Sequence, residues 1–384
     1  MTYKTVVFWC PFISKVGTIN AVIESAKALN SSNKFRCKII NVFGEFDDYS
    51  NIFSKNQIKL IKLTNFKFIN YLPKKSFFWS RLNYLLIIFL SIIPLYLYLK
   101  KNQNNILFTY LLTSLPLFLV KFFNFKNKII FRISGKIHYT FIRKMILSYS
   151  REKIHKVLIQ TKFSEKNLIE QKIFKKKQIL YLEDPIIDLK KINKLKKKKI
   201  ENKFSNKKFY VAIGRLTKQK NFQFLIDSIK EILIKKKIFL VILGDGEQKD
   251  ILLKMIKNNQ LENRIFLLGY KKNIYRYLSR SNGLICTSLW EEPGFVIQEA
   301  AACKKIILTS NCESGPAEFL NGGENGYIFK SNDKESFIKK FNLMTKEKDK
   351  HFKKIQNNYI KSKRYTKKHF AQKIFDEIQL SDNI

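Results

Sequence analysis

Two glutamates on either side of a tight turn form the segment of the sequence best suited to chemistry. Glu291 precedes a Pro-Gly turn, and Glu299 lies one turn inside a helix expected to begin near Phe295. The first NH groups of a helix are unpaired and carry the positive end of its dipole, so this turn predicts a phosphate-binding site. The Glu299 carboxylate is suited to accept two vicinal ribose hydroxyls, and Glu291 to face a sugar beside the phosphates. A solvated acidic loop ahead of an ordinary amphipathic helix is the alternative.

A second candidate group follows an earlier strand of the same half. Gly214 and Arg215 come directly after the apolar run 210–213, and Lys220 lies close behind them. Ligands of open α/β sheets bind at the carboxyl ends of the strands, where Arg215 and Lys220 would place two cations. Such fixed cations can stabilise a departing diphosphate without a metal ion. The turn 244–246 ends the next strand and is interpreted as structural.

The elements that would hold these residues alternate between strands and helices. Val6 to Trp9 reads as a strand, a loop containing Gly17 follows, and 19–29 has helical spacing before the next strand at 37–43. This βαβ pattern is typical of a parallel, doubly wound sheet. Further strands are expected at 129–133, 157–161, 179–182, 210–213, 239–243, 265–268, 283–286 and 305–308.

The strands fall into two series separated by a lysine-dense stretch. We expect an N-terminal Rossmann-like domain over 1–185, a basic linker over 186–205 and a second Rossmann-like domain over 206–350. A helical segment, 351–384, is expected to pack back on the N-terminal domain. Its predicted buried anchors are Phe352, Ile355, Tyr359, Phe370 and Ile374.

The most apolar segment, 82–99, carries no charge and is interrupted by Pro94. Basic residues flank it, and a second apolar stretch, 111–123, follows. Three interpretations remain open: a buried helix of the α/β core, a helix that faces a membrane surface, and a transmembrane span. The surrounding βα alternation argues most strongly against the last.

The composition is strongly basic, with 73 Lys and Arg against 30 Asp and Glu and a formal net charge of +43. Only ten of these cations are Arg, the residue that reads bases and clamps phosphates bidentately. Abundant Lys, Asn and Ile also indicate A/T-rich codon usage. The charge still favours anionic partners, of which an anionic membrane surface is expected and nucleic acid is not.

The cysteines show no disulfide or zinc pattern. Cys286 and Cys303 lie in apolar runs and are expected to be buried, and no CxxC pair occurs. The first residues lack the long apolar core of a signal peptide. These features predict a cytoplasmic protein.

Taken together, the motifs resemble the group 1 glycosyltransferases (glycosyltransferase family 4). The resemblance rests on Gly214-Arg215 with Lys220, on Gly244-Asp245-Gly246, on Glu291-x7-Glu299, and on Gly315-Pro316-x-Glu318 with Gly326. Order and spacing match over about residues 205–335. The resemblance implies a GT-B fold, in which two Rossmann-like α/β domains face each other across a cleft.

The resemblance also implies roles for individual residues. Arg215 and Lys220 would bind the donor diphosphate, Glu299 the ribose and Glu291 the donor sugar. Backbone NH groups would contact phosphates or sugar, and the residues concerned are Gly294, Phe295 and Val296. Gly17 would let the N-terminal domain approach the diphosphate, and Tyr270 would lie near the base.

Two features bear on mechanism. Many family members place a histidine near the anomeric carbon, where this chain has Arg132-Ile133-Ser134-Gly135 followed by His138. A structural His138 is the alternative. The resemblance implies retention of anomeric configuration without a metal, and no DxD motif is present. The nearest approach, 45–48, is interpreted as a surface loop.

The sequence therefore predicts a cytoplasmic enzyme, peripheral to the inner membrane, of the hexosyltransferase type. It would move a sugar from a nucleotide-sugar substrate, with UDP as the expected nucleotide, to a lipid-linked saccharide or a surface-polysaccharide acceptor such as lipopolysaccharide or capsule. No cofactor is expected. The alternatives are a basic protein that binds nucleic acid or another anion, and a nucleotide-sugar epimerase of the GT-B fold.

Overall fold

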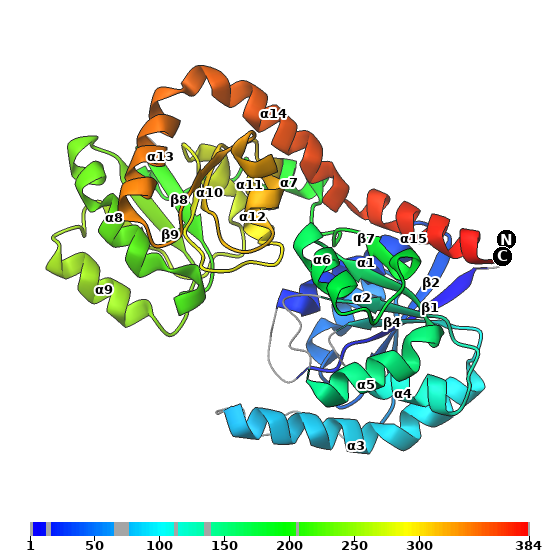
Figure 1. Ribbon diagram of the computed structural model, residues 1–384. Helices are drawn as coiled ribbons and strands as arrows, with labels where there is room; N and C mark the ends of the chain where they lie inside the picture. Colours follow the sequence, from blue (N-terminus) through cyan, green and yellow to red (C-terminus); the bar gives the residue numbers. More distant parts are fainter. Residues whose placement is uncertain are drawn as a thin grey trace. The chain divides into compact units, whose positions relative to one another are not determined.

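The computed structural model describes residues 3–12, 17–64, 77–110, 114–133, 140–204 and 207–382. The chain divides into two compact units (Figure 1). Unit 1 comprises Met1–Ile186 and Lys367–Ile384, and unit 2 comprises Ile187–Thr366. Each unit is an α/β fold with its own parallel sheet.

The sheet of unit 1 has seven strands among the described residues, in the order β3-β2-β1-β4-β5-β6-β7. Every described pairing is parallel, so the carboxyl ends of the strands lie at one edge. The strands are β1 (Lys4–Trp9), β2 (Phe35–Asn41), β3 (Lys59–Lys62), β4 (Ile106–Tyr110), β5 (Ile129–Arg132), β6 (Ile154–Ile159) and β7 (Ile179–Tyr181).

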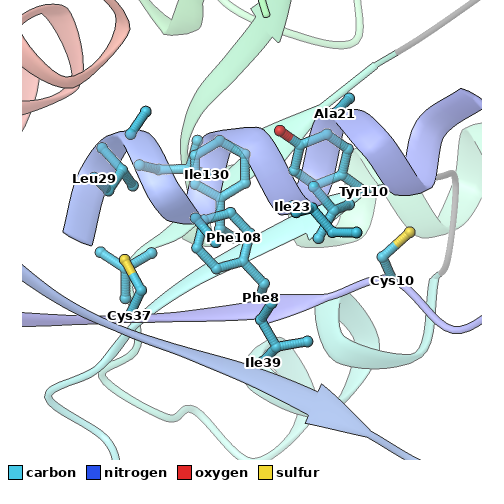
Figure 2. Close-up of a cluster of buried hydrophobic side chains, with 14 of the residues drawn as sticks. Phe8, Cys10, Ala21, Ile23, Leu29, Cys37, Ile39, Phe108, Tyr110 and Ile130 are labelled. Carbon is cyan, nitrogen blue, oxygen red and sulfur yellow. The ribbon is translucent and has the colours of Figure 1, made fainter. Parts of the chain in front are cut away.

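Side chains of β1 alternate between two apolar clusters, as a strand covered on both faces requires. Val6 and Phe8 join one cluster, which includes α1 (Gly17–Asn30) and α15 (Lys367–Asp382). Figure 2 shows this cluster, with Phe8 beside Phe108. Val7 and Trp9 join the other cluster. It includes α3 (Phe77–Lys101), α4 (Ser114–Phe122), α5 (Phe141–Ser150) and α6 (Lys162–Glu170); a short α2 (Ser50–Lys55) precedes β3.

Unit 2 has six strands in the order β10-β9-β8-β11-β12-β13, again with parallel pairings only among the described residues. The strands are β8 (Phe209–Ile213), β9 (Phe239–Leu243), β10 (Ile265–Leu267), β11 (Leu284–Cys286), β12 (Ile307–Ser310) and β13 (Tyr327–Phe329). Counted within the unit, this is the 3-2-1-4-5-6 order of a Rossmann fold. The strand order reverses between β8 and β11.

The helices of unit 2 follow the strands or flank the sheet. They are α7 (Leu189–Leu195), α8 (Phe222–Lys235), α9 (Lys249–Asn258), α10 (Tyr275–Arg280), α11 (Phe295–Ala302), α12 (Pro316–Phe319), α13 (Lys334–Lys346) and α14 (His351–Ser362). α8 buries an apolar stripe against the sheet, since Leu225, Ile229 and Leu233 follow helical spacing and are all buried.

The segment 186–205 differs from the expected linker. It forms α7 and a short 3-10 helix, Asn202–Phe204, and it buries Ile187, Ile192 and Phe204. The lysines of this segment are mostly exposed. They are so numerous that the few buried apolar residues between them gave no recognisable helical pattern in the sequence. The C-terminal region also divides, because α14 belongs to unit 2 and α15 to unit 1. Phe352, expected as a buried anchor, is 74% exposed.

Helix α3 contains the apolar segment 82–99 and has two different sides. Ile87, Leu95 and Leu99 are buried against the sheet, whereas Phe89 and Ile93 are mostly exposed. The helix is therefore in part a core helix, with a second apolar side that the described residues of unit 1 leave exposed. Within the described ranges, no helix is long and apolar enough to cross a membrane.

The five cysteines are all buried and none forms a disulfide, as expected for Cys286 and Cys303. The segment 45–48 is only in part the surface loop that the sequence predicted, since Asp48 is exposed and the first two residues are not. Glu45 and Phe46 are buried, and the Glu45 carboxylate accepts hydrogen bonds from the backbone NH groups of Val42 (2.9 Å) and Phe43 (2.7 Å). Burial raises the pKa of Glu45 to about 7.

Candidate functional site

The candidate site lies at the carboxyl edge of the unit 2 sheet, where the loops after β8 and β11 meet. These two strands are neighbours at the point where the strand order reverses, the usual ligand position in such folds. The loops are joined by hydrogen bonds: Leu289 N donates to Gln219 O (2.8 Å), and Thr287 Oγ1 donates to Lys220 O (3.0 Å). Residues about 70 positions apart are thereby held together.

The loop after β8 packs closely against the loop after β9. A Cβ atom at Gly244 would lie 1.8 Å from Gly214 O, and the Gly244 φ of +153° also disfavours a side chain. Leu216 N donates to Asp245 O (2.9 Å). The turn 244–246 therefore has a structural role, as the sequence indicated, because it fixes the backbone that carries Arg215.

Lys220 and Glu291 form an ion pair across the two loops. Lys220 Nζ donates to Glu291 Oε1, and Ser288 Oγ donates to the same oxygen at 2.6 Å. Glu291 is only 7% exposed, so its carboxylate depends on these two partners. A Cβ atom at Gly214 would lie 2.9 Å from Lys220 Cε, so the lysine side chain passes directly over this glycine.

Helix α11 begins shortly after Glu291 in the sequence. Gly294 is its N-cap, in the left-handed conformation with φ of 82°, which glycine adopts without strain. Phe295 and Val296 follow as its first helical residues. The turn before the helix is held by Ser314, whose Oγ donates to Glu292 Oε2 (2.8 Å) and to Glu291 O (3.1 Å). Helix α11 thus begins at Phe295, as the sequence predicted, directly after the turn that follows Glu291.

Glu299 lies on the same helix and has a partner that the sequence did not indicate. Tyr275 OH donates to Glu299 Oε1 at 3.0 Å. Burial raises the pKa of Glu299 to about 7, and the hydrogen bond from Tyr275 and the nearby Lys191 oppose this rise in pKa. The carboxyl group is therefore placed to change its charge near neutral pH.

Arg215 and Tyr270 lie on the loops around this centre. Arg215 is exposed on the loop after β8. Tyr270 is 77% exposed and lies in the loop after β10, where the preceding Gly269 O accepts a hydrogen bond from Gly244 N (3.0 Å). The loop of Tyr270 therefore adjoins the loop that supports Arg215.

The other two candidate residues, Gly17 and His138, belong to unit 1. Gly17 is the first residue of α1, which follows β1 in the sequence. His138 lies outside the described residues.

Sequence reasoning missed three supporting residues of unit 2, namely Ser288, Ser314 and Tyr275. A signal existed for Ser288, because it lies two residues after the end of β11, at the edge where the candidate loops meet. Ser314 and Tyr275 come from loops or helices far along the chain, and their contacts depend on tertiary packing alone.

Unit 1 has a buried ion pair at the equivalent edge of its own sheet. Arg132, at the end of β5, donates from Nε to Asp184 Oδ1 (2.8 Å) and from Nη2 to Asp184 Oδ2 (2.9 Å). Both side chains are almost fully buried, and Asp184 N donates to Gln160 Oε1 (3.2 Å). The pair holds the ends of β5 and β7 at fixed spacing. Among the residues that the structure describes, no three His, Cys, Asp or Glu side chains are grouped so as to hold a metal ion.

Comparisons with known proteins agree with this architecture. The chain is 32% identical over 169 residues to an uncharacterized glycosyltransferase of Methanocaldococcus jannaschii, covering 43% of this chain and 41% of that protein. It is 28% identical over 242 residues to an N-acetylgalactosaminyltransferase of Campylobacter jejuni, covering 62% and 61%. The chain thus spans less than two thirds of either relative.

A solved structure matches almost the whole chain. The Anabaena protein HepE, in complex with UDP and glucose, superposes with a TM-score of 0.71 at 16% identity, over 98% of this chain and 100% of that one. The two parallel sheets and this likeness define an α/β protein of the GT-B class. Residues 193–363, which make up most of unit 2, match the family model described as glycosyl transferases group 1.

Proposed function

We propose that this protein transfers a sugar from a UDP-sugar to a lipid-linked saccharide or a surface-polysaccharide acceptor. The observation that carries the proposal is the convergence of Lys220, Glu291 and the N-terminus of α11 at the strand reversal of unit 2. The Anabaena structure holds UDP and glucose, and the Campylobacter relative is named for an acceptor linked to diphospho-undecaprenol. The first supports a UDP-sugar donor, and the second supports a lipid-linked acceptor.

The cations and the helix would receive the diphosphate. Arg215 and Lys220 supply positive charge, and the backbone NH groups of Gly294, Phe295 and Val296 supply oriented donors. This charge is fixed before the reaction, so it stabilises the negative charge that develops on the departing diphosphate. Transfer then proceeds without a metal ion.

Glu299 would hold the ribose by accepting its two hydroxyls, a task for which the ionised carboxylate is suited. Glu291 would contact the donor sugar, and its present partner Lys220 would be shared with the phosphates. The exposed ring of Tyr270 would lie against the base. In unit 1, Gly17 would allow close approach to the diphosphate, and His138 would act near the anomeric carbon.

Retention of anomeric configuration is part of the proposal. Glu291 is paired with Lys220 and Glu299 with Tyr275, which supports a ligand-binding role for these carboxylates rather than a role as nucleophile. A front-face displacement, in which the acceptor attacks from the side that the diphosphate leaves, requires neither of them as nucleophile.

We also propose that the enzyme works in the cytoplasm at the inner membrane. A lipid-linked acceptor would be presented at this surface, and a net charge of +43 favours contact with anionic lipid.

The first experiment is thermal unfolding of the purified protein with UDP, GDP and ADP. A ligand that binds only the folded state raises the melting temperature by mass action. We expect UDP to give the largest rise, and Arg215→Ala and Glu299→Ala each to abolish it. Lys218→Ala is the matched control, because it removes an exposed cation from the same loop and should leave the response to UDP unchanged.

Two results would contradict the proposal. If no nucleotide raises the melting temperature, or if the variants respond as the wild type does, the cluster does not bind a nucleotide and anion binding by the basic surface becomes the better explanation. A further assay distinguishes transfer from epimerisation. A transferase releases free UDP only when an acceptor is present, whereas an epimerase does not require an acceptor.

A further inference from the structure

Three helices of unit 1 leave large apolar side chains uncovered on one face. On α3 the exposed residues recur every three or four positions, so they form a stripe along the helix. They are Leu82, Leu85, Leu86, Phe89, Ile92, Ile93 and Leu97. Phe89 is 71% and Ile93 is 70% exposed, although the opposite side of the same helix is buried in the core.

The stripe continues onto α4 and α5. Phe118, Phe122 and Phe123 are exposed on and just after α4, and Phe141, Met145 and Tyr149 form an i, i+4, i+8 row on α5. Figure 1 shows α3, α4 and α5 beside one another, and contacts join α3 to α4 and α4 to α5. We call this surface the α3–α5 face.

Specific contacts make the surface continuous. The ring of Tyr96 on α3 lies 4.5 Å from the ring of Phe123, centroid to centroid, and Phe122 packs edge-on against Phe123 at 5.0 Å. Lys121 on α4 lies 5.6 Å from the ring centroid of Tyr149 on α5. An uncovered apolar surface that spans three helices is unusual for a monomer and marks an interaction site.

The charge around the α3–α5 face is mostly positive, and the acidic Glu152, just after α5, is paired with Lys121 at 2.7 Å. Residues 49–151 contain no Asp or Glu, although the whole chain has 30. Lys100 and Lys101 end α3, Lys126 follows α4 and Lys144 lies on α5, and all four are exposed. Apolar side chains rimmed by lysines, with no acidic residue in the segment, complement a surface that is apolar inside and anionic outside.

We propose that the α3–α5 face docks onto an anionic lipid bilayer, with the exposed apolar side chains of α3 and α5 entering the interface and the lysines contacting phosphate head groups. α3 then lies along the membrane plane, because its other side is fixed on the sheet. A second copy of this chain is a poorer occupant, since it would bring the same excess of positive charge to the contact. The inference concerns a different surface from the nucleotide site and does not depend on it.

The test is flotation of the full chain with vesicles of phosphatidylglycerol and phosphatidylcholine. The variant Phe89→Gln with Ile93→Gln removes two exposed apolar groups without changing net charge or helix-forming tendency greatly. The matched control, Phe352→Gln with Ile360→Gln, removes the same residue types from exposed positions on α14 of unit 2. We expect the Phe89→Gln, Ile93→Gln variant to bind vesicles at least about tenfold more weakly, because it loses the free energy of moving two apolar side chains from water into the lipid interface. The control variant should bind as the wild type does.

A second variant, Phe141→Gln with Met145→Gln, tests α5 independently and serves if the first variant unfolds at a lower temperature. Three results would overturn the proposal. The first is a wild type that fails to float with anionic vesicles. The second is that both variants bind as tightly as the wild type and salt releases all the proteins equally, which would mean that basic charge alone binds lipid. The third is a wild-type dimer, seen by sedimentation, that the variants convert to a monomer without loss of vesicle binding, which would make the face a self-association surface.

Discussion

At the scale of single residues, the Lys220–Glu291 pair couples the site to the stability of unit 2. Both side chains are mostly buried, and a buried carboxylate that loses its cation is left uncompensated. We expect Lys220→Met to lower the free energy of unfolding by about 3 kcal/mol. Adding Glu291→Gln should recover most of this loss, because the unpaired charge is removed with its partner.

Urea denaturation of the two single variants and the double variant measures this coupling. If the two losses simply add, Lys220 and Glu291 do not interact in solution and the pair has no place in holding the β8 and β11 loops together.

Glu299 predicts a pH dependence for nucleotide binding. Its pKa in the free protein is raised to about 7, so the carboxyl group is protonated below this pH and ionised above it. Ribose hydroxyls donate to the ionised form, and therefore the affinity for UDP should increase as the pH rises from 6 to 8. At pH 6 about one tenth of the protein is ionised at this site, which makes the apparent affinity about tenfold weaker than at pH 8.

Calorimetric titration with UDP across this range provides the measurement. UDP itself titrates near a pKa of ~6. The Glu299→Gln variant retains that contribution of the ligand and should lose the step near pH 7. Parallel pH profiles for the wild type and the variant would show that ionisation of Glu299 has no part in binding.

At the scale of elements, the turns after the strands of unit 2 are held by close backbone packing. Gly244→Ala would place a Cβ atom 1.8 Å from Gly214 O, and the loop that carries Arg215 and Lys220 would have to move. We expect a loss of about 3 kcal/mol or more in stability, with loss of UDP binding.

Gly269→Ala is the matched control. Its φ of +70° is also unfavourable for alanine, but nothing lies within 4 Å of the added Cβ atom. The backbone strain alone should cost about 1 kcal/mol. Equal losses for the two variants in thermal unfolding would refute the steric contribution at Gly244.

Much of the architecture was accessible from the sequence, because buried parallel strands are short apolar runs with turn residues between them. The expected strands at 210–213 and 239–243 coincide with β8 and β9. β3 escaped prediction since Lys59–Lys62 is an edge strand with lysine at both ends, and β4 was hidden between the apolar segments of α3 and α4. α7 was missed because one buried isoleucine, Ile192, anchors a helix that otherwise reads as polar.

The parts of the candidate site that depend on short local sequence patterns could be predicted, and the parts that depend on contacts between distant segments could not. A turn at a strand end and a helix start are encoded within about ten residues, which is why the surroundings of Glu291 and Gly294 could be inferred. The contact of Tyr275 with Glu299 and that of Ser314 with Glu292 join distant segments. No periodicity records such pairs, so only the folded chain reveals them.

At the scale of the whole molecule, the chain leaves unit 1 after Ile186 and returns to it at Lys367. The returning helix α15 supplies Phe370, Ala371, Ile374 and Ile378 to the core beside α1. Unit 1 is therefore completed by residues that follow all of unit 2 in the sequence. Its stability depends on the last helix, whereas β8, β11 and α11, which carry the candidate site, belong entirely to unit 2.

This connectivity predicts that damage to α15 acts on unit 1 alone. Phe370→Ala removes a fully buried ring and should cost unit 1 about 3–5 kcal/mol. Hydrogen exchange followed by mass spectrometry should then find faster exchange in β1, β2 and α1 but not in β8, β9 or β11. Lys373→Ala, at an exposed position on the same helix, is the control and should leave both units unchanged. Equal acceleration in both sheets would mean that the two units unfold as one cooperative body.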